Sequence, residues 1–290
     1  CIRDSYYSAY GMTTDFTGVL GAQYIYHFDK CLFMPSDLTG GVEFNHDNLH
    51  DKATDMQKYR DAALDEDPGA TGNRLQQLID KYTPAPLNQV VNIASAYVQN
   101  EWNNEQWSFL IGARVDKNSI MDKAVFSPRA NIRYNPTQDV NIRFSYAEGF
   151  RAPQAFDEDL HISNVGGARV SIVRDPNLKE ERSRSVNGSV DWYHYFGDFQ
   201  VNMLLEGFYT KLSDPFVLSA PVESENGSLV QTRSNGSGAK VYGSTLEGKI
   251  VWRNKVQIQA GITVQRSLYD EPEEWSADKE HLTDAERYSD

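Results

Sequence analysis

Apolar and polar side chains alternate with a period of two along several stretches of the chain. Residues 256–265 place glutamine, glycine or threonine between the apolar positions Val256, Ile258, Ala260, Ile262 and Val264. The same alternation recurs in residues 126–134 and 140–146. Successive side chains of a β-strand point to opposite faces, so each stretch is predicted to be a strand with one apolar and one polar wall.

The connections between these stretches alternate in length. Short polar turns are predicted within residues 27–32, 102–107, 135–140, 195–199 and 252–256. Three long segments rich in Gly and Asp lie between other strands, at residues 48–88, 151–181 and 219–238. Short turns at one end and long extracellular loops at the other are typical of an outer-membrane barrel. About ten strands are predicted, each long enough for the ~9–11 residues that cross the hydrocarbon core.

Aromatic residues lie beside the short turns, as in the interfacial girdle of a membrane barrel. They are Tyr26, Phe28, Trp102, Trp107, Tyr134, Trp192, Phe196, Phe199 and Trp252. A large soluble β-sandwich is the alternative, because its strands alternate too. Strands of about 14 residues exceed the usual ~5–6, which favours the barrel. The predicted fold is therefore all-β, an antiparallel up-and-down transmembrane β-barrel, with the three long segments as extracellular loops.

Composition narrows the function classes. The net charge of −13 argues against nucleic-acid binding, which needs basic patches. The mean hydropathy of −0.58 and the lack of a long apolar run exclude a transmembrane helix, but barrel strands look hydrophilic on average. Two cysteines make no disulfide framework. Cys1 as a lipidated first residue is one interpretation; a fragment boundary is favoured, because the following residues run straight into a strand.

The stretch from Thr54 to Tyr82 has a different pattern. Residues 72–82 carry Leu75, Leu78 and Ile79 at helical spacing, whereas residues 65–72 contain turn signals. We expect an extracellular loop with a short helix packed on the rim of the barrel.

Two short motifs carry a resemblance to a known family. Phe150, Arg151, Ala152 and Pro153 form the first box; Asp175, Pro176, Asn177 and Leu178 begin the second, about 25 residues later. With the alternating strands around them, residues 126–218 resemble the β-barrel of TonB-dependent outer-membrane receptors, especially those of Bacteroidetes-like Gram-negative bacteria. In that family the boxes flank a long outer loop. Pro153 removes a ladder donor and is expected to end the strand.

The segment between the boxes supplies the candidate ligand-binding residues, which are Asp157, Glu158, Asp159, His161, Arg169 and Arg174. The resemblance implies that a histidine here is a candidate axial haem ligand, and neutral imidazole binds iron. A solvated loop histidine is the alternative. The acids in residues 157–159 and 65–67 are candidates for Ca²⁺ or for a merely solvated acidic loop. Spacing alone predicts no metal site, and no resident cofactor is expected.

The resemblance implies a receptor rather than an enzyme. Such a receptor imports an iron-siderophore, cobalamin or haem, using energy from the TonB–ExbB–ExbD complex through a plug domain. The barrel would have about 22 strands, so residues 1–290 are expected to be a partial barrel without plug or C-terminal strands. The expected location is the outer membrane of a Gram-negative bacterium, with lipid and a surface lipoprotein as candidate partners. A structural or adhesive surface β-protein and a passive porin are the alternatives.

The polar faces of the predicted strands contain a set of residues that, as the resemblance implies, would face the plug domain. They are Asn131, Arg133, Asn141, Arg143, Gln257 and Gln259. Arg and Asn have the donors to hydrogen-bond such a domain, and a water-lined wall is the alternative.

Overall fold

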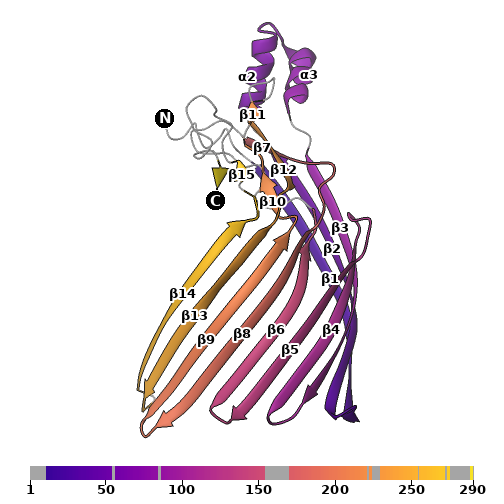
Figure 1. Cartoon of the computed structure of the whole chain (residues 1–290). Coiled ribbons are helices and arrows are strands. Elements are labelled where there is room, and N and C mark those ends of the chain that lie inside the picture. The colour runs from indigo at the N-terminus through magenta and orange to yellow at the C-terminus, as the bar shows by residue number, and fades with distance from the viewer. Residues whose placement is uncertain are drawn as a thin grey trace.

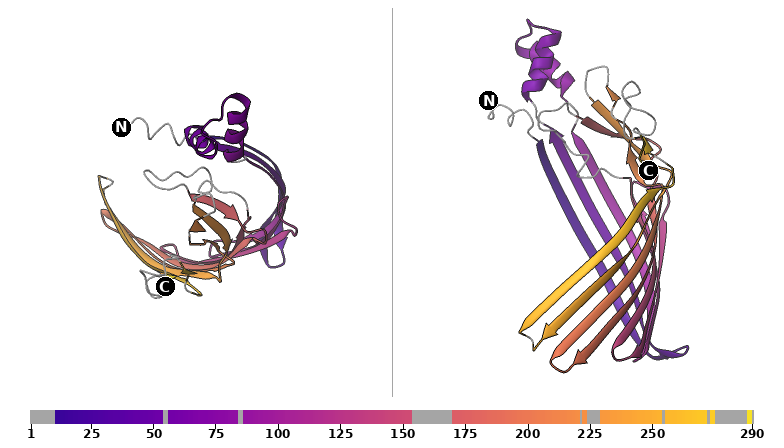
Figure 2. Two further views of the ribbon diagram at one scale, coloured as in Figure 1. Left: turned by 90° about the horizontal axis from the view of Figure 1, so that it is seen from above. Right: turned by 60° about the vertical axis from the view of Figure 1, so that its left-hand side comes forward.

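The computed structural model describes residues 11–53, 56–83, 86–153, 170–220, 222–223, 229–253, 255–271, 273–274 and 288–289. Its main feature is a ten-stranded antiparallel sheet. The strands of this sheet follow one another in space in the same order as in the sequence, and each is hydrogen-bonded to the next. The strands in spatial order are β1 (Gly11–Cys31), β2 (Met34–Ala53), β3 (Leu87–Asn103), β4 (Trp107–Asn118), β5 (Val125–Thr137), β6 (Val140–Arg151), β8 (Glu181–Phe196), β9 (Phe199–Ser213), β13 (Ala239–Trp252) and β14 (Val256–Tyr269). Seen from above, the sheet follows an open arc (Figure 2). The all-β, partial-barrel prediction is confirmed.

The strand register keeps the apolar and polar positions on separate faces. One row of directly opposed residues runs through Ile142, Val190, Leu205, Leu246 and Ile262. The next row, one residue along each strand, runs through Arg143, Ser189, Glu206, Thr245 and Thr263. A slip of one residue in any strand would mix the two faces, so the alternation in the sequence fixes the register.

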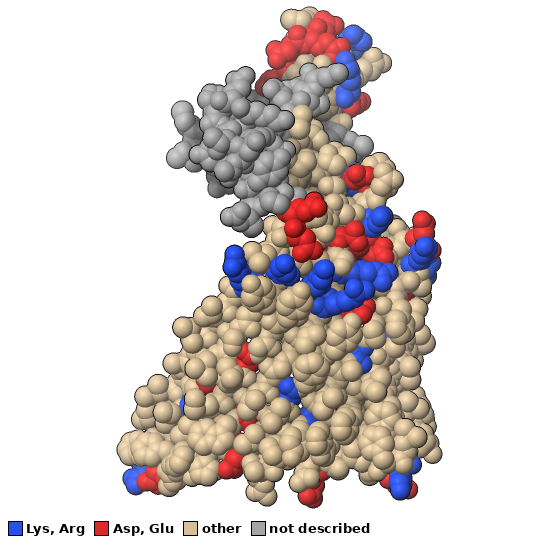
Figure 3. All heavy atoms as spheres, in the orientation of Figure 1, with Lys and Arg blue, Asp and Glu red and all other residues tan. Residues whose placement is uncertain are grey.

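The apolar face is the convex one and lies open. Leu20 is 77% exposed and Val264 is 68% exposed, although both are large apolar side chains. Figure 3 shows this face, where Lys, Arg, Asp and Glu gather at the upper and lower ends and are sparse between them. An apolar band on the outside with a polar inside is the arrangement of a barrel wall in lipid.

Aromatic rings gather beside the short turns. These turns lie at the lower end of the sheet in Figure 1. The rings of Trp107 and Tyr134 stack with centroids 4.1 Å apart, and those of Tyr26 and Phe28 meet edge to face at 4.6 Å. Phe199 lies opposite Phe196 on one side and Trp252 on the other. The predicted grouping of aromatic residues beside the turns is therefore present.

A helical hairpin stands above the upper rim between β2 and β3 (Figure 1). It consists of α2 (Met56–Glu66) and α3 (Gly72–Tyr82), packed through a small core of Tyr59, Ala63, Ala70, Leu78 and Ile79. The helix at 72–82 was predicted, but α2 was not. The loop bounds 48–88 were also wrong, because β2 continues to Ala53 and β3 begins at Leu87.

A second, small sheet lies inside the arc at the upper rim when the molecule is seen from above (Figure 2). Its strands are β7 (Val170–Arg174), β10 (Phe216–Leu218), β11 (Val222–Glu223) and β12 (Leu229–Asn235), with β7 and β12 parallel. A further short pair is formed by β15 (Glu273–Glu274) and β16 (Tyr288–Ser289). The loops expected at 151–181 and 219–238 thus contain strands of their own.

Candidate functional site at the upper rim

The first box closes strand β6 and anchors it to the rim. Phe150 and Arg151 are the last strand residues, and Ala152 is buried against Met121 and Val125. Pro153 follows directly, so the strand ends where the missing donor predicted. The Arg151 guanidinium lies 5.7 Å from the centre of the Phe216 ring, on β10, which brings the small sheet against the end of β6.

The second box is a turn that closes β7. The Asp175 carboxylate accepts a hydrogen bond from the Asn177 amide at 2.7 Å, and its carbonyl accepts one from the Leu178 amide at 3.0 Å. The Asp175 amide in turn donates to the Arg233 carbonyl of β12 at 2.9 Å. Asp at the first position of such a turn is favoured because its carboxylate satisfies the amide two residues on.

Arg174 joins the two boxes. Its Nη1 donates to the Pro153 carbonyl at 2.9 Å and to the Gln89 side-chain oxygen of β3 at 3.4 Å. Of the six predicted ligand-binding residues, Arg174 alone lies within the described ranges. Its role there is to fix the ends of the intervening segment to each other. Asp157, Glu158, Asp159, His161 and Arg169 lie outside the described residues.

Asn235 makes a second set of contacts that holds the rim together, which we call the clasp. The sequence did not single out Asn235 for this role. Its side-chain oxygen accepts from the Lys179 amide at 2.8 Å, and its amide nitrogen donates to the carbonyls of Lys179 at 3.1 Å and Asp214 at 2.8 Å. It therefore links β12, the segment before β8 and the end of β9. In the sequence Asn235 begins an Asn-Gly-Ser triplet, which gives no sign of these partners.

An ion pair lies where the chain enters β8. The Arg182 guanidinium contacts the Glu180 carboxylate at 2.8 Å. Burial is the largest single effect and raises the pKa of Glu180. The hydrogen bond from Arg182, a backbone hydrogen bond and the nearby positive charges together outweigh it, so the pKa of this carboxyl lies below its ordinary value. Beside it, Glu181 accepts a hydrogen bond from the Phe216 amide at 3.0 Å, which again ties β8 to the small sheet.

The concave face is polar and partly ionic below the rim. Arg114 of β4 contacts Glu43 of β2 at 2.8 Å and Asp116 at 2.7 Å, while Ser95 donates to Asp116 at 2.6 Å. The polar positions predicted from alternation share this face. Arg143 donates to Asn141 at 2.7 Å, and Arg133 donates to Asn103 at 2.9 Å. The Arg114 network was missed, because its partner Glu43 lies two strands away.

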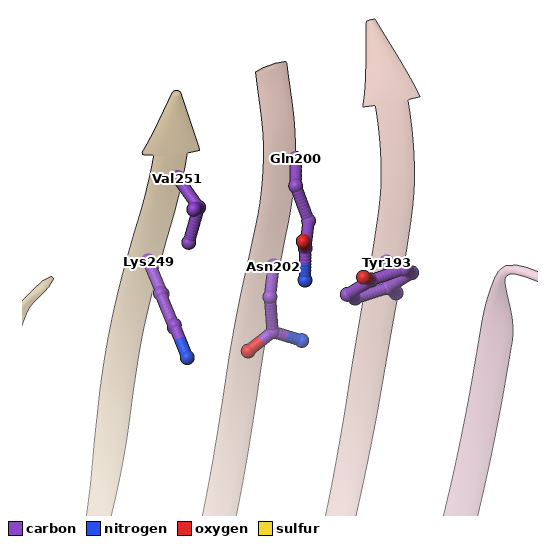
Figure 4. A pocket seen from close by; sticks show the side chains of 5 residues that line it. All are labelled: Tyr193, Gln200, Asn202, Lys249 and Val251. Carbon is purple, nitrogen blue, oxygen red and sulfur yellow. The ribbon is translucent and has the colours of Figure 1, made fainter. Parts of the chain in front are cut away.

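A shallow hollow of about 230 Å³ opens on the same face nearer the turns. Its lining residues are Tyr193, Gln200, Asn202, Lys249 and Val251, which come from three adjacent strands (Figure 4). Asn202 also donates to the Trp192 carbonyl at 3.3 Å. The hollow presents donors and one ammonium group, which suits a polar surface rather than an apolar ligand.

Within the described ranges, no three His, Cys, Asp or Glu side chains are grouped as metal ligands would be. Nor does any described helix have the length and apolar character needed to cross a membrane.

Comparisons with known proteins agree with this architecture. A family model described as "TonB dependent receptor-like, beta-barrel" matches residues 2–289. The siderophore receptor PirA from Pseudomonas aeruginosa is similar in structure, with a TM-score of 0.60, 14% identity, and coverage of 90% of this chain and 50% of that one. The FrpB iron transporter from Neisseria meningitidis (F5-1 variant) has a TM-score of 0.58 at 16% identity, covering 94% of this chain and 39% of that one.

The copper transporter OprC is also similar, with a TM-score of 0.56 at 12% identity, covering 90% of this chain and 39% of that one. No curated protein matches the sequence. The chain thus spans half or less of the length of these solved structures.

Proposed function

Because the chain belongs to the TonB-dependent receptor-like β-barrel family, we propose that it is part of an outer-membrane receptor that binds and imports a scarce, bulky nutrient. The observation that carries this proposal is the two-sided wall. Ten strands present an open apolar band outward and a polar, partly ionic surface inward. Such a wall separates lipid from a polar interior, which an enzyme site does not require.

The rim supports a role in ligand capture. Arg174 is bonded to the Pro153 carbonyl and Asn235 to the Lys179 amide, so the described residues on either side of the segment between the boxes have fixed positions at the rim. Functional loops on a rigid scaffold are the usual arrangement for binding. We propose that His161, Arg169 and the acids at 157–159 contact the nutrient or a cation that accompanies it.

The nutrient class and the partners belong to the same proposal. Solved relatives are described as a siderophore receptor, an iron transporter and a copper transporter. Ferric siderophore, haem and cobalamin are the proposed classes for this receptor. Energy would come from the TonB–ExbB–ExbD complex through a plug that contacts the polar inner wall, in a Bacteroidetes-like Gram-negative outer membrane.

Retention of coloured ligands tests the binding step. Ferric siderophores, haem and cobalamin would each be passed over the immobilised complete receptor in detergent, and the retained visible spectrum recorded. Retention of haem that the substitution His161→Ala abolishes would make His161 an axial ligand. Retention of another chromophore by both forms would contradict the haem role, and retention of none would contradict import of these three classes.

Energy coupling separates the receptor from its alternatives. We expect uptake of the retained ligand by intact cells to stop when TonB is deleted. A passive porin would instead give ion conductance and uptake that persist without TonB. A structural or adhesive protein would show neither uptake nor ligand retention.

A further inference from the structure

Positive charge gathers in one level of the outer face, just below the upper rim. Three cations lie directly opposite one another on adjacent strands: Arg184 on β8, Lys211 on β9 and Lys240 on β13. We call them the cation row. Figure 3 shows a band of Lys and Arg at this level, above the sparsely charged band of the convex face. The chain as a whole carries a net charge of −13, so this concentration runs against its overall balance.

The register places the cation row on the lipid-facing side. In the same strands, Leu205 and Leu246 occupy the same face as Lys211 and Lys240, an even number of residues away. All three side chains are partly exposed on this face. The exposed fraction is 60% for Arg184, 50% for Lys211 and 38% for Lys240. They therefore point away from the interior where a nutrient would pass.

Like charges directly opposite each other in a sheet oppose pairing. The described carboxylates offset this repulsion only in part. Asp270 lies between the two lysines, 4.0 Å from the Lys211 ammonium and 3.9 Å from that of Lys240, and Glu148 lies 3.4 Å from Arg184. These separations exceed the 2.7–2.9 Å of a charge-assisted hydrogen bond. Two carboxylates shared among three cations leave the row positive.

Tyrosines define the depth of the row. Tyr209 and Tyr242 lie opposite each other two residues nearer the apolar band than Lys211 and Lys240, and their rings stack with centroids 6.5 Å apart. Two strand residues span about 7 Å. Tyrosine is favoured at the level of lipid headgroups. The cation row is thus set where the phosphates of the outer leaflet would lie, within reach of flexible Lys and Arg side chains.

We propose that the cation row binds the phosphate groups of a phosphorylated lipid in the outer leaflet of the membrane. Arg184 offers a planar, multidonor guanidinium, and the two lysines offer mobile ammonium groups, all suited to phosphate oxygens. The bound headgroup supplies the negative charge that Asp270 and Glu148 supply only in part. This inference rests on the proposed function, since it requires the chain to stand in the outer membrane.

Native mass spectrometry of the complete receptor in detergent tests the inference, with bisphosphorylated lipid A and its monophosphoryl form as probes. We expect tighter retention of the bisphosphorylated lipid, and a loss of about tenfold in its apparent affinity in the triple variant R184Q, K211Q and K240Q. The matched control R143Q, K249Q and K255Q removes three charges from the inner face and a lower turn and should retain lipid as the wild type does.

A second variant moves binding the other way. Asp270→Asn removes the carboxylate between the lysines, so we expect lipid retention to rise. Equal retention by the wild type and the triple variant, or a loss as large in the control, would overturn the inference. Release of the lipid by millimolar inorganic phosphate would assign the row to free phosphate rather than to a headgroup, and would overturn it too.

The same preparation separates this inference from the proposed function. A receptor that stays soluble and monomeric without detergent, with no heat-dependent shift in gel mobility, would contradict the membrane barrel itself. A detergent-dependent, heat-modifiable barrel that shows no preference for the bisphosphorylated lipid would contradict the cation-row inference alone.

Discussion

At the scale of single residues, Asn235 links three segments of the rim. Its side chain makes three hydrogen bonds to backbone groups of Lys179 and Asp214. Asn235→Ala removes all three, and each is worth about 1 kcal/mol. We expect the Lys179 amide, which donates to this side chain, to exchange its hydrogen about tenfold faster, a change that hydrogen-exchange mass spectrometry of residues 176–182 would detect.

A graded control identifies the contact. Asn235→Asp keeps the oxygen that accepts from the Lys179 amide but loses both donated bonds. Exchange at Lys179 should therefore stay closer to the wild type in the Asp variant than in the Ala variant. If both variants exchange at the wild-type rate, the clasp contributes nothing to the order of the rim.

At the scale of elements, the helical hairpin has an acid-sensitive closure. The Glu66 carboxylate at the end of α2 accepts hydrogen bonds from the Lys81 ammonium at 2.7 Å and the Tyr82 hydroxyl at 2.6 Å, both at the end of α3. These bonds lower the pKa of Glu66 below its usual 4.5. A carboxyl whose pKa is lowered in the folded state adds to the folding stability at pH values above its ordinary pKa. That added stability is lost as the pH falls through the lowered pKa of the folded state.

The expected result is faster hydrogen exchange at the ends of α2 and α3 in acid than at neutral pH, because protonation of the Glu66 carboxylate weakens its bonds to Lys81 and Tyr82. Hydrogen exchange in residues 56–82, corrected for the intrinsic pH dependence, would report it between pH 7 and pH 3. Glu66→Gln should flatten this acid response, while Asp61→Asn should leave it unchanged. An acid response that persists in the Gln variant would mean that another group controls the hairpin.

The same hairpin shows which elements a local sequence pattern can predict and which it cannot. Leu75, Leu78 and Ile79 lie at helical spacing, which made α3 predictable, and period-two alternation did the same for the barrel strands. Of the α2 side chains that the structure describes, Tyr59 and Ala63 are buried, too few to mark an apolar stripe. The parallel pairing of β7 with β12 joins residues about 60 positions apart, such as Val170 and Leu229, and no local signal encodes it.

In the candidate site, too, the local features were predictable and the long-range contacts were not. The boxes at 150–153 and 175–178 were found because their residues are adjacent in the chain, and the structure places both at the rim. The contacts that join them were not predictable, since Arg174 reaches Pro153 across 21 residues and Asn235 reaches Lys179 across 56. Arg114 and Glu43 were not predicted to be partners, because only the register of three strands brings them together.

At the scale of the whole molecule, the two faces of the sheet should respond oppositely to the same substitution. Leu246 and Thr245 are neighbours near the middle of β13, and they point to the convex and concave faces respectively. If the convex face contacts lipid, Leu246→Lys places a charge near the bilayer midplane and costs about 2–4 kcal/mol, whereas Thr245→Lys faces a polar interior and costs little. Equilibrium refolding of the complete receptor into lipid vesicles, followed by urea titration, measures both. Equal destabilisation by the two variants would contradict a lipid-facing convex surface, because a sheet in water on both sides has no reason to penalise one face more than the other.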